Sequence, residues 1–572
     1  GRVECLKFAF AFLVALWVGS ALSLFAEHPV LHRTRFSLST LPLILLVGLL
    51  ALPVLALLAS WLPWGVVQAD TGAILREMAS TVLPGYVWTT LWLGLWVAVG
   101  AAVVGTATAA AVTLFEFPGR RVFEWLLLLP LAMPAYVTAY AYTDFLQFSG
   151  PLQVGLRETF GLEGRLLPEV RSLWGAIWVF TFSLYPYVYL LARTALGERA
   201  AHLMEAARLL GAPLSRRITS IALPLARPAV AAGVALALME TLADFGVTSY
   251  FGIQTFTTGI IKAWLSMDNR IAAAQLSTML LALVLVLLWL EHRAERRMRF
   301  TAKGTGHAGA TEAQPVPLRG LARGLAWGVC TLPVFMGFVA PVAFMLRPLA
   351  SDWSVLPWSR FLEWAWNSVR LGGITAGLAV AVALALAFAV RRKPDLLTRG
   401  VVRLASVGYA VPGAVIVVGL LLPVGWVQAH FPHWGVGALV TTTAVGIVWA
   451  YLVRFCAVAL QSVQSGYARI PASLDDSARM LGAGSARLMA NVHWPLLRRS
   501  TAAAALLVFV DVMKELPATM VLRPFNSDTL AVVAYQLARD ERLGEAALPS
   551  LALVAVGLVP VILLSRTLRG RA

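Results

Sequence analysis

Two pairs of carboxylic acids lie within apolar stretches of the chain, where charged side chains are unusual. They are Glu240 with Asp244, and Asp511 with Glu515. A spacing of four places both acids of a pair on one helix face, and about 12 preceding helical residues would put them about 18 Å along a membrane span. Charges at that depth are costly and usually face a polar pathway, and Lys514 can pair with Asp511. The acids therefore predict a pathway for a cationic or metal substrate, or a gate held by ion pairs; a structural role at helix ends is equally open.

Catalytic motifs are missing from the rest of the sequence. There is no HExxH motif, no GxSxG motif and no cluster of His and Cys. Cys5, Cys330 and Cys456 are isolated, so neither a disulfide framework nor a thiolate metal site is expected. A phosphate-binding P-loop ends in Gly-Lys-Ser/Thr, and none of the lysines follows a glycine. We therefore expect no enzymatic activity, no stably bound metal ion and no cofactor in this chain.

The composition indicates a membrane protein. The chain has 572 residues, of which 59% are hydrophobic and 13% are charged, whereas soluble domains are about 45–50% apolar and about 25% charged. Apolar runs of 18 or more residues recur, which is typical of a polytopic helical protein. The net charge of +17 is explained by basic cytoplasmic loops. We therefore expect contact with a lipid bilayer and no binding of nucleic acid.

The apolar runs predict an all-α fold with about 12 transmembrane helices. Basic residues gather in alternate loops, and by the positive-inside rule these loops and the C-terminus lie in the cytoplasm. An apolar stretch at 8–25 fits neither a further span nor a signal segment cleanly, and its role stays open. The helices are expected at 41–62, 85–115, 124–148, 173–195, 228–250, 276–290, 324–346, 364–390, 402–428, 435–460, 500–522 and 549–568.

One polar segment occurs twice between the apolar runs. The first repeat segment, residues 205–225, reads EAARLLGAPLSRRITSIALPL, and the second repeat segment, residues 476–496, reads DSARMLGAGSARLMANVHWPL. They align without a gap at a spacing of 271 residues. In each, a short helix is expected to end at a glycine, Gly211 or Gly482, and a second short helix to stop near a proline, Pro224 or Pro495. Such a polar unit, repeated on the cytoplasmic side, indicates a docking surface.

Other matched positions support a duplication of two halves. Trp88 and Pro134 have counterparts in Trp366 and Pro412 at a spacing of 278 residues. We therefore expect two six-helix halves of the same orientation, related as parallel repeats. The predicted divisions are an N-terminal segment, 1–40, a first half, 41–298, a cytoplasmic linker rich in Gly, Thr and Pro, 299–323, and a second half, 324–572.

The repeat segments resemble the EAA loop of ABC importer permeases. The motif residues are Glu205, Ala206, Ala207, Gly211 and Pro224 in the first copy, and Asp476, Ser477, Ala478, Gly482 and Pro495 in the second. The second copy departs from the pattern because Asp replaces Glu and Ser replaces Ala. The resemblance implies a type I importer permease of the bacterial cytoplasmic (inner) membrane. It implies that these residues couple the permease to a separate ATPase subunit, expected in two copies, which would bind ATP and Mg.

The resemblance also implies a cargo. Residues 514–551 and 244–264 are similar to regions of ferric iron permeases, which take iron from a periplasmic or extracellular substrate-binding protein. Ferric iron is thus the expected cargo, and Glu240, Asp244, Asp511, Lys514 and Glu515 are the expected pathway residues. Two alternatives stay open. One is the same machine with thiamine, a polyamine or a phosphonate as cargo, and the other is an ion-coupled carrier that uses the acids as relays.

Overall fold

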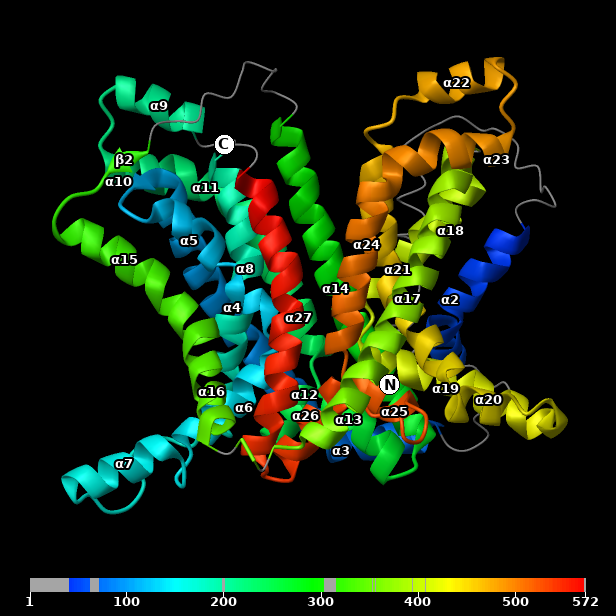
Figure 1. Ribbon diagram of the computed structural model, residues 1–572, viewed down its shortest axis with the longest axis horizontal. Coiled ribbons are helices and arrows are strands. Elements are labelled where there is room, and N and C mark those ends of the chain that lie inside the picture. The colour runs from blue at the N-terminus through cyan, green and yellow to red at the C-terminus, as the bar shows by residue number, and fades with distance from the viewer. Residues whose placement is uncertain are drawn as a thin grey trace. The chain divides into compact units, whose positions relative to one another are not determined.

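The computed structural model is built almost wholly of helices (Figure 1). It describes residues 41–61, 71–197, 201–302, 315–351, 353–354, 356–392, 395–406 and 408–569. The predicted N-terminal segment, with its stretch at 8–25, and residues 303–314 of the predicted linker lie outside the described residues. On either side of that gap, helix α14 (Arg270–Ala302) ends and a short strand, β2 (Val316–Pro317), begins.

The chain forms two compact units, and these are not the two sequence halves. The first unit combines residues 359–532, from the middle of the second half, with residues 1–83 and 259–282. The second unit combines residues 84–258, from the middle of the first half, with residues 283–358 and 533–572. Each unit therefore takes the central helices of one predicted half together with outer helices of the other.

The first unit is centred on α21 and α24, which pack along each other, while α2 packs on α19. The helices that it shares in part with the second unit are α13 (Phe256–Ile261), α14, α17 (Trp358–Arg392) and α26 (Leu530–Arg539). Its other elements are α2 (Leu41–Ala59), α3 (Thr71–Ser80), a π-helical turn (Lys262–Ser266), α18 (Leu396–Ser406), a 3-10 turn (Gly408–Ala410), α19 (Gly413–His430), a 3-10 turn (Pro432–Trp434), α20 (Val436–Thr442), α21 (Ala444–Tyr467), α22 (Ala472–Met480), α23 (Ser485–Arg487), a π-helical turn (Leu488–His493), α24 (Trp494–Lys514) and α25 (Pro517–Leu522).

The second unit is centred on α8 and α11, and α16 packs on α27 and α6. Strands β1 and β2 pair in parallel, with Phe115 opposite Val316 and Glu116 opposite Pro317. Apart from the shared helices, its elements are α4 (Leu83–Leu114), β1 (Phe115–Glu116), α5 (Arg120–Leu126), a 3-10 turn (Leu129–Ala132), α6 (Ala135–Leu146), α7 (Pro151–Phe160), α8 (Leu173–Ala195), α9 (Ala201–Leu209), α10 (Leu214–Arg217), a π-helical turn (Ile218–Ala222), α11 (Leu223–Ala243), α12 (Gly246–Tyr250), β2, α15 (Leu321–Val334), a π-helical turn (Phe335–Val339), α16 (Ala340–Ser351) and α27 (Leu543–Arg569).

The structure confirms the all-α polytopic class, with a somewhat smaller helix count. Among the described residues, ten helices are long and apolar enough to cross a membrane, or eleven if a pair bent by 88° counts as one span. That pair, Arg120–Ala132 with Ala135–Phe160, replaces the single helix expected at 124–148, because Pro130 and Pro134 interrupt it. Helix α24 corresponds to the expected span at 500–522. It carries Arg498, Arg499, Asp511 and Lys514 and is not among these ten helices.

Four other expected helices have bounds that differ from the prediction. The helix expected at 402–428 breaks before α19, which starts after Pro412, and the one expected at 435–460 breaks at Thr443, which caps α21. The helices expected at 228–250 and 500–522 end at Ala243 and Lys514, and each is followed by a separate short helix, α12 or α25.

The predicted stop near Pro224 is wrong, and so is the one near Pro495. In both repeat segments the second helix continues beyond the proline, and Leu214–Ala243 forms one span of 30 residues. A proline ring clashes with the carbonyl one turn earlier in a regular helix. Here a π-helical turn, Ile218–Ala222 or Leu488–His493, directly precedes each proline-containing helix start. We attribute the tolerance of the proline to this wider turn.

Candidate functional site

The two repeat segments fold in the same way, down to single hydrogen bonds. Helices α9 and α22 each end in a Schellman motif: Gly211 N–H donates to the Arg208 carbonyl at 3.0 Å, and Ala212 N–H to that of Ala207 at 3.0 Å. In the second segment Gly482 donates to Arg479 at 2.9 Å, and Ala483 to Ala478 at 3.0 Å. Gly211 and Gly482 have φ of +78° and +79°, a left-handed conformation in which glycine carries no Cβ penalty.

Each motif exposes two large apolar side chains at its tip. Leu209 and Leu210 are 85% and 88% exposed, and Met480 and Leu481 are both 89% exposed. The predicted motif acids, Glu205 and Asp476, are also exposed, as are both glycines, while Ala207 and Ala478 are half-buried. Apolar tips of this kind, beside an acid and arginines, are suited to a protein partner. Pro224 and Pro495 lie at the start of α11 and α24, outside this exposed tip.

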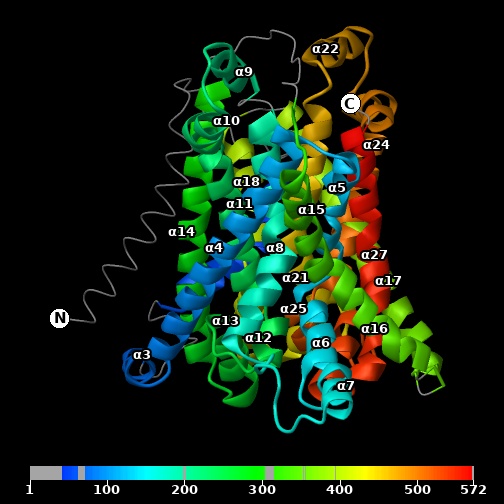
Figure 2. The same cartoon turned by 90° about the vertical axis from the view of Figure 1, so that its left-hand side faces the viewer.

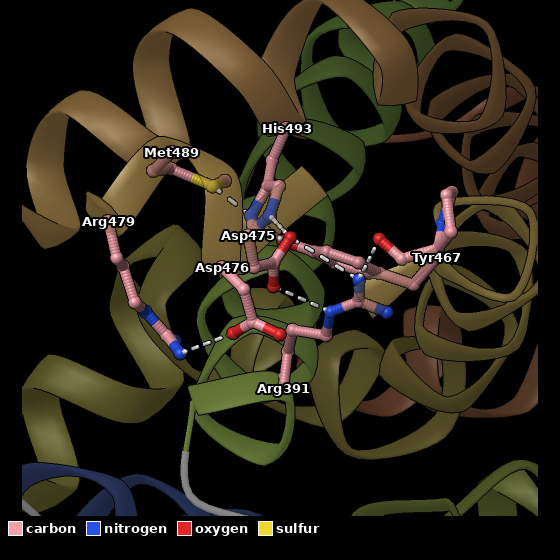
Figure 3. Close-up of polar contacts among 8 residues, drawn as sticks. Arg391, Tyr467, Asp475, Asp476, Arg479, Met489 and His493 are labelled. Carbon is pink, nitrogen blue, oxygen red and sulfur yellow. Dashed lines mark hydrogen bonds and ion pairs between the residues drawn. The ribbon is translucent and has the colours of Figure 1, made fainter. Parts of the chain in front are cut away.

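Sequence reasoning missed a buried acid next to the predicted one. Asp475 is 4% exposed, and its Oδ2 accepts from Arg391 Nε at 2.8 Å while its Oδ1 lies 3.0 Å from His493 Nε2 (Figure 3). His493 Nδ1 lies 3.2 Å from the Tyr467 hydroxyl. The exposed Asp476 makes only a surface pair with Arg479 at 3.6 Å, which contributes little. The alignment of the two segments could have revealed this acid, because Asp475 aligns with Met204, which is buried in the first segment.

The surroundings of Asp475 determine how the docking of α22 changes with pH. Burial, the largest single influence, raises the pKa of this carboxyl, but hydrogen bonds from Arg391 and His493 outweigh it, so the pKa lies below the ordinary value. A depressed pKa stabilises the docked helix at every pH above the unfolded value of about 3.9, and this contribution is lost as pH falls through the folded pKa.

We therefore expect α22 to stay docked from pH 8 to pH 5 and to loosen only below about pH 4. The measurement is the mobility of a nitroxide attached to an Ala472→Cys variant. Asp475→Asn in the same background should abolish the acid transition. A rise in mobility already between pH 7 and pH 5 would show that the carboxylate does not control docking.

The second acid of each predicted pathway pair lies just beyond its helix. Asp244 is the extended residue after α11, and its Oδ1 accepts from Val247 N–H at 2.8 Å, at the start of α12. Glu515 follows α24 in the same way and accepts from Ala518 N–H at 3.2 Å and Thr519 N–H at 3.1 Å. The expectation that both acids of a pair share one helix face is therefore wrong.

Glu515 is also half of a buried ion pair. Arg454 Nη1 lies 3.2 Å from Glu515 Oε1, and the two side chains are 13% and 1% exposed. The remaining acids, Glu240 and Asp511, lie within α11 and α24, and Lys514 is the last residue of α24; all three are half-buried. In each unit these residues lie at the opposite end from the repeat segment, as α9 and α12 show in one unit and α22 and α25 in the other (Figures 1 and 2). The structure thus separates a tip suited to docking from the predicted pathway residues.

Comparison with known proteins finds similarity to one family of transport proteins. Residues 101–300 match the family described as "Binding-protein-dependent transport system inner membrane component". The Fe(3+)-transport system permease protein FbpB 2 of Haemophilus influenzae is 27% identical over 484 residues, which cover 83% of this chain and 88% of that protein.

Relatives named for other cargoes align with part of the chain. The putative 2-aminoethylphosphonate transport system permease protein PhnU of Salmonella choleraesuis is 25% identical over 41% of this chain and 81% of its own length. The sulfate transport system permease protein CysT of Salmonella typhimurium is 28% identical over 36% of this chain and 73% of its own length. With its membrane-length helices and these matches, the chain resembles the multi-pass permeases of binding-protein-dependent importers.

Proposed function

We propose that this permease imports ferric iron and is driven by ATP hydrolysis on separate ATPase subunits, one docked on each repeat segment. The observation that carries the coupling role is the duplicated glycine-ended helix with its exposed apolar tip. The two tips are alike in backbone and unlike in side chains, since Glu205 and Ala206 correspond to Asp476 and Ser477. Two copies of one ATPase can therefore bind both segments, with unequal contacts.

The iron assignment is supported by the relative named for Fe(3+) transport, which aligns along most of both chains. A second relative named for ferric transport, from Actinobacillus pleuropneumoniae, is 22% identical over 92% of this chain. The half-buried Glu240, Asp244 and Asp511 supply carboxylate oxygens, which suit hard cations. We propose that these acids, with Lys514, line the pathway, and that Glu515 supports it structurally.

The remaining partners follow from the importer class. We propose that the repeat segments and the C-terminus face the cytoplasm, and that a substrate-binding protein docks at the other end of the permease. ATP and Mg would be bound by the ATPase subunits. A phosphonate is the second candidate cargo, because a relative named for 2-aminoethylphosphonate aligns with 41% of the chain.

Uptake in cells tests the cargo. A strain lacking this protein is complemented with wild type, and the uptake of radioactive ferric iron, 2-aminoethylphosphonate and sulfate is compared. Restored uptake of iron alone is the expected result. If uptake of the phosphonate or of sulfate is restored instead, that compound and not iron is the cargo. The permease role itself would then stand.

A second experiment tests the docking tips. Leu210→Asp together with Leu481→Asp should weaken binding of the ATPase subunit at least about tenfold, because each change removes apolar contact from a tip and adds a charge. Binding is measured by titrating the labelled ATPase onto the purified permease. Phe525→Asp is the matched control, since Phe525 is 99% exposed and follows α25, at the other end of its unit from α22. Unchanged affinity of the double variant would exclude the tips as the docking surface.

A further inference from the structure

Among the described residues, the polar network beneath the second repeat segment has no counterpart beneath the first. At a spacing of 271 residues, Asp475, His493 and Tyr467 correspond to Met204, Ala222 and Leu196. All three of these apolar residues are buried in one hydrophobic cluster with residues of α4 and α8. The same helix–glycine–helix segment is therefore built once around a carboxylate and once around apolar side chains.

Arg391 shows the same contrast. It is the penultimate residue of α17, and at the 278-residue spacing its counterpart is Thr113, the penultimate residue of α4. The hydroxyl of Thr113 is buried and has no hydrogen-bond partner among the described residues. Arg391, in contrast, contacts Asp475 and also donates to the Pro471 carbonyl at 3.0 Å, just before α22.

Stability alone does not explain the charges. Replacing a buried ion pair by apolar residues of similar volume is often neutral or stabilising, and the first segment shows an apolar solution at the same place. The charged side chains instead fix the orientation of the second repeat segment relative to the helices that hold it. One carboxylate is held by a side chain from the end of α17 and by another from the turn that leads into α24, and His493 is in turn held by Tyr467 at the end of α21.

We propose that Asp475, Arg391, His493 and Tyr467 position the second repeat segment as a rigid extension of α17 and α24. A displacement of α22 is then transferred to both membrane helices at once. At the corresponding positions of the first repeat segment, the displacement is transferred through the apolar packing of Leu196, Met204 and Ala222. The two docking sites are therefore unequal, and tight coupling depends on the second. This inference rests on the proposed function, because it takes the segments as the places where ATPase motion enters.

The test exchanges the network for the residues that the first segment uses. The variant Arg391→Thr/Tyr467→Leu/Asp475→Met/His493→Ala is reconstituted with its ATPase and binding protein. Transport per ATP hydrolysed is measured with whichever tested cargo wild type carries. We expect an unchanged ATPase affinity and ATP hydrolysis close to wild type. Transport per ATP should fall at least about fivefold, which is the factor that corresponds to the lower end of typical coupling energies.

Two further variants keep the test decisive if the exchange variant does not fold. Asp475→Asn keeps the size of the side chain and should also uncouple transport from hydrolysis, whereas Asp475→Glu should restore most of the coupling. Glu169→Gln, which removes an acid from an exposed pair with Arg165, is the control and should change nothing. An unchanged transport-to-ATP ratio in the exchange variant, or in Asp475→Asn, overturns the positioning role. If wild type itself shows no ATP-dependent transport, the proposed function falls and this inference falls with it.

Discussion

Replacing Gly211 and Gly482 together by proline is expected to reduce transport to the level of cells that lack the protein. Both glycines have φ near +80°, whereas proline is fixed near −65° and has no N–H to donate. Each change therefore breaks a Schellman motif and reorients an apolar tip. The protein should still insert, because both positions are exposed and a Cβ added at either one would meet no atom within 4 Å. Uptake at equal membrane levels is the measurement.

The matched control replaces the same two glycines by asparagine. Asparagine tolerates the left-handed conformation better than other non-glycine residues and keeps its N–H, so this variant should retain most of the transport. Transport at the wild-type level by both the proline and the asparagine variants would mean that the geometry of the tips does not matter. Loss of transport in both variants would indicate that the added side-chain atoms at the tips cause the defect, and not the change in backbone conformation.

Replacing Glu515 by glutamine is expected to destabilise the permease by about 3–5 kcal/mol, because it leaves the buried Arg454 cation without its counter-charge. The side chain of Glu515 is only 1% exposed. It also accepts two backbone hydrogen bonds at the start of α25. Thermal unfolding in detergent, with the amount of folded protein in the membrane, measures the effect.

The double variant Arg454→Met/Glu515→Gln separates structure from transport. It removes both charges and should recover much of the lost stability, because no charge is left buried alone. Asp511→Asn, a change to the half-buried acid one turn earlier, is the comparison and should lower transport more than stability. If Glu515→Gln is as stable as wild type but fails to transport, Glu515 belongs to the pathway and its structural role is wrong.

The sequence predicted what depends on short-range pattern. The glycine-ended helices of the repeat segments are an example, because a left-handed glycine after an amphipathic turn is a local signal. The membrane class and the equivalence of Asp244 with Glu515 were also predictable. The prolines were misread. Pro224 and Pro495 each suggested a helix stop, but a π-helical turn before them allows the helix to continue.

Long-range contacts were not predictable from pattern. Asp475 meets Arg391 across 84 residues of chain, and Glu515 meets Arg454 across 61, so no sequence pattern near either acid indicates which residue it pairs with. The compact units differ from the sequence halves for a related reason. Helix α2 packs on α19, and only the fold shows that a first-half helix contributes to the unit built from the second half.

Coupling through the repeat segments is best measured as transport by purified permease in liposomes, together with its ATPase subunit and a ferric-binding partner. Ferric iron should accumulate only when ATP is supplied on the side of the repeat segments. The Gly211→Pro/Gly482→Pro variant should accumulate none under the same conditions. Iron accumulation without ATP, or equal accumulation by the proline variant, would contradict the claim that the repeat segments couple ATP hydrolysis to import.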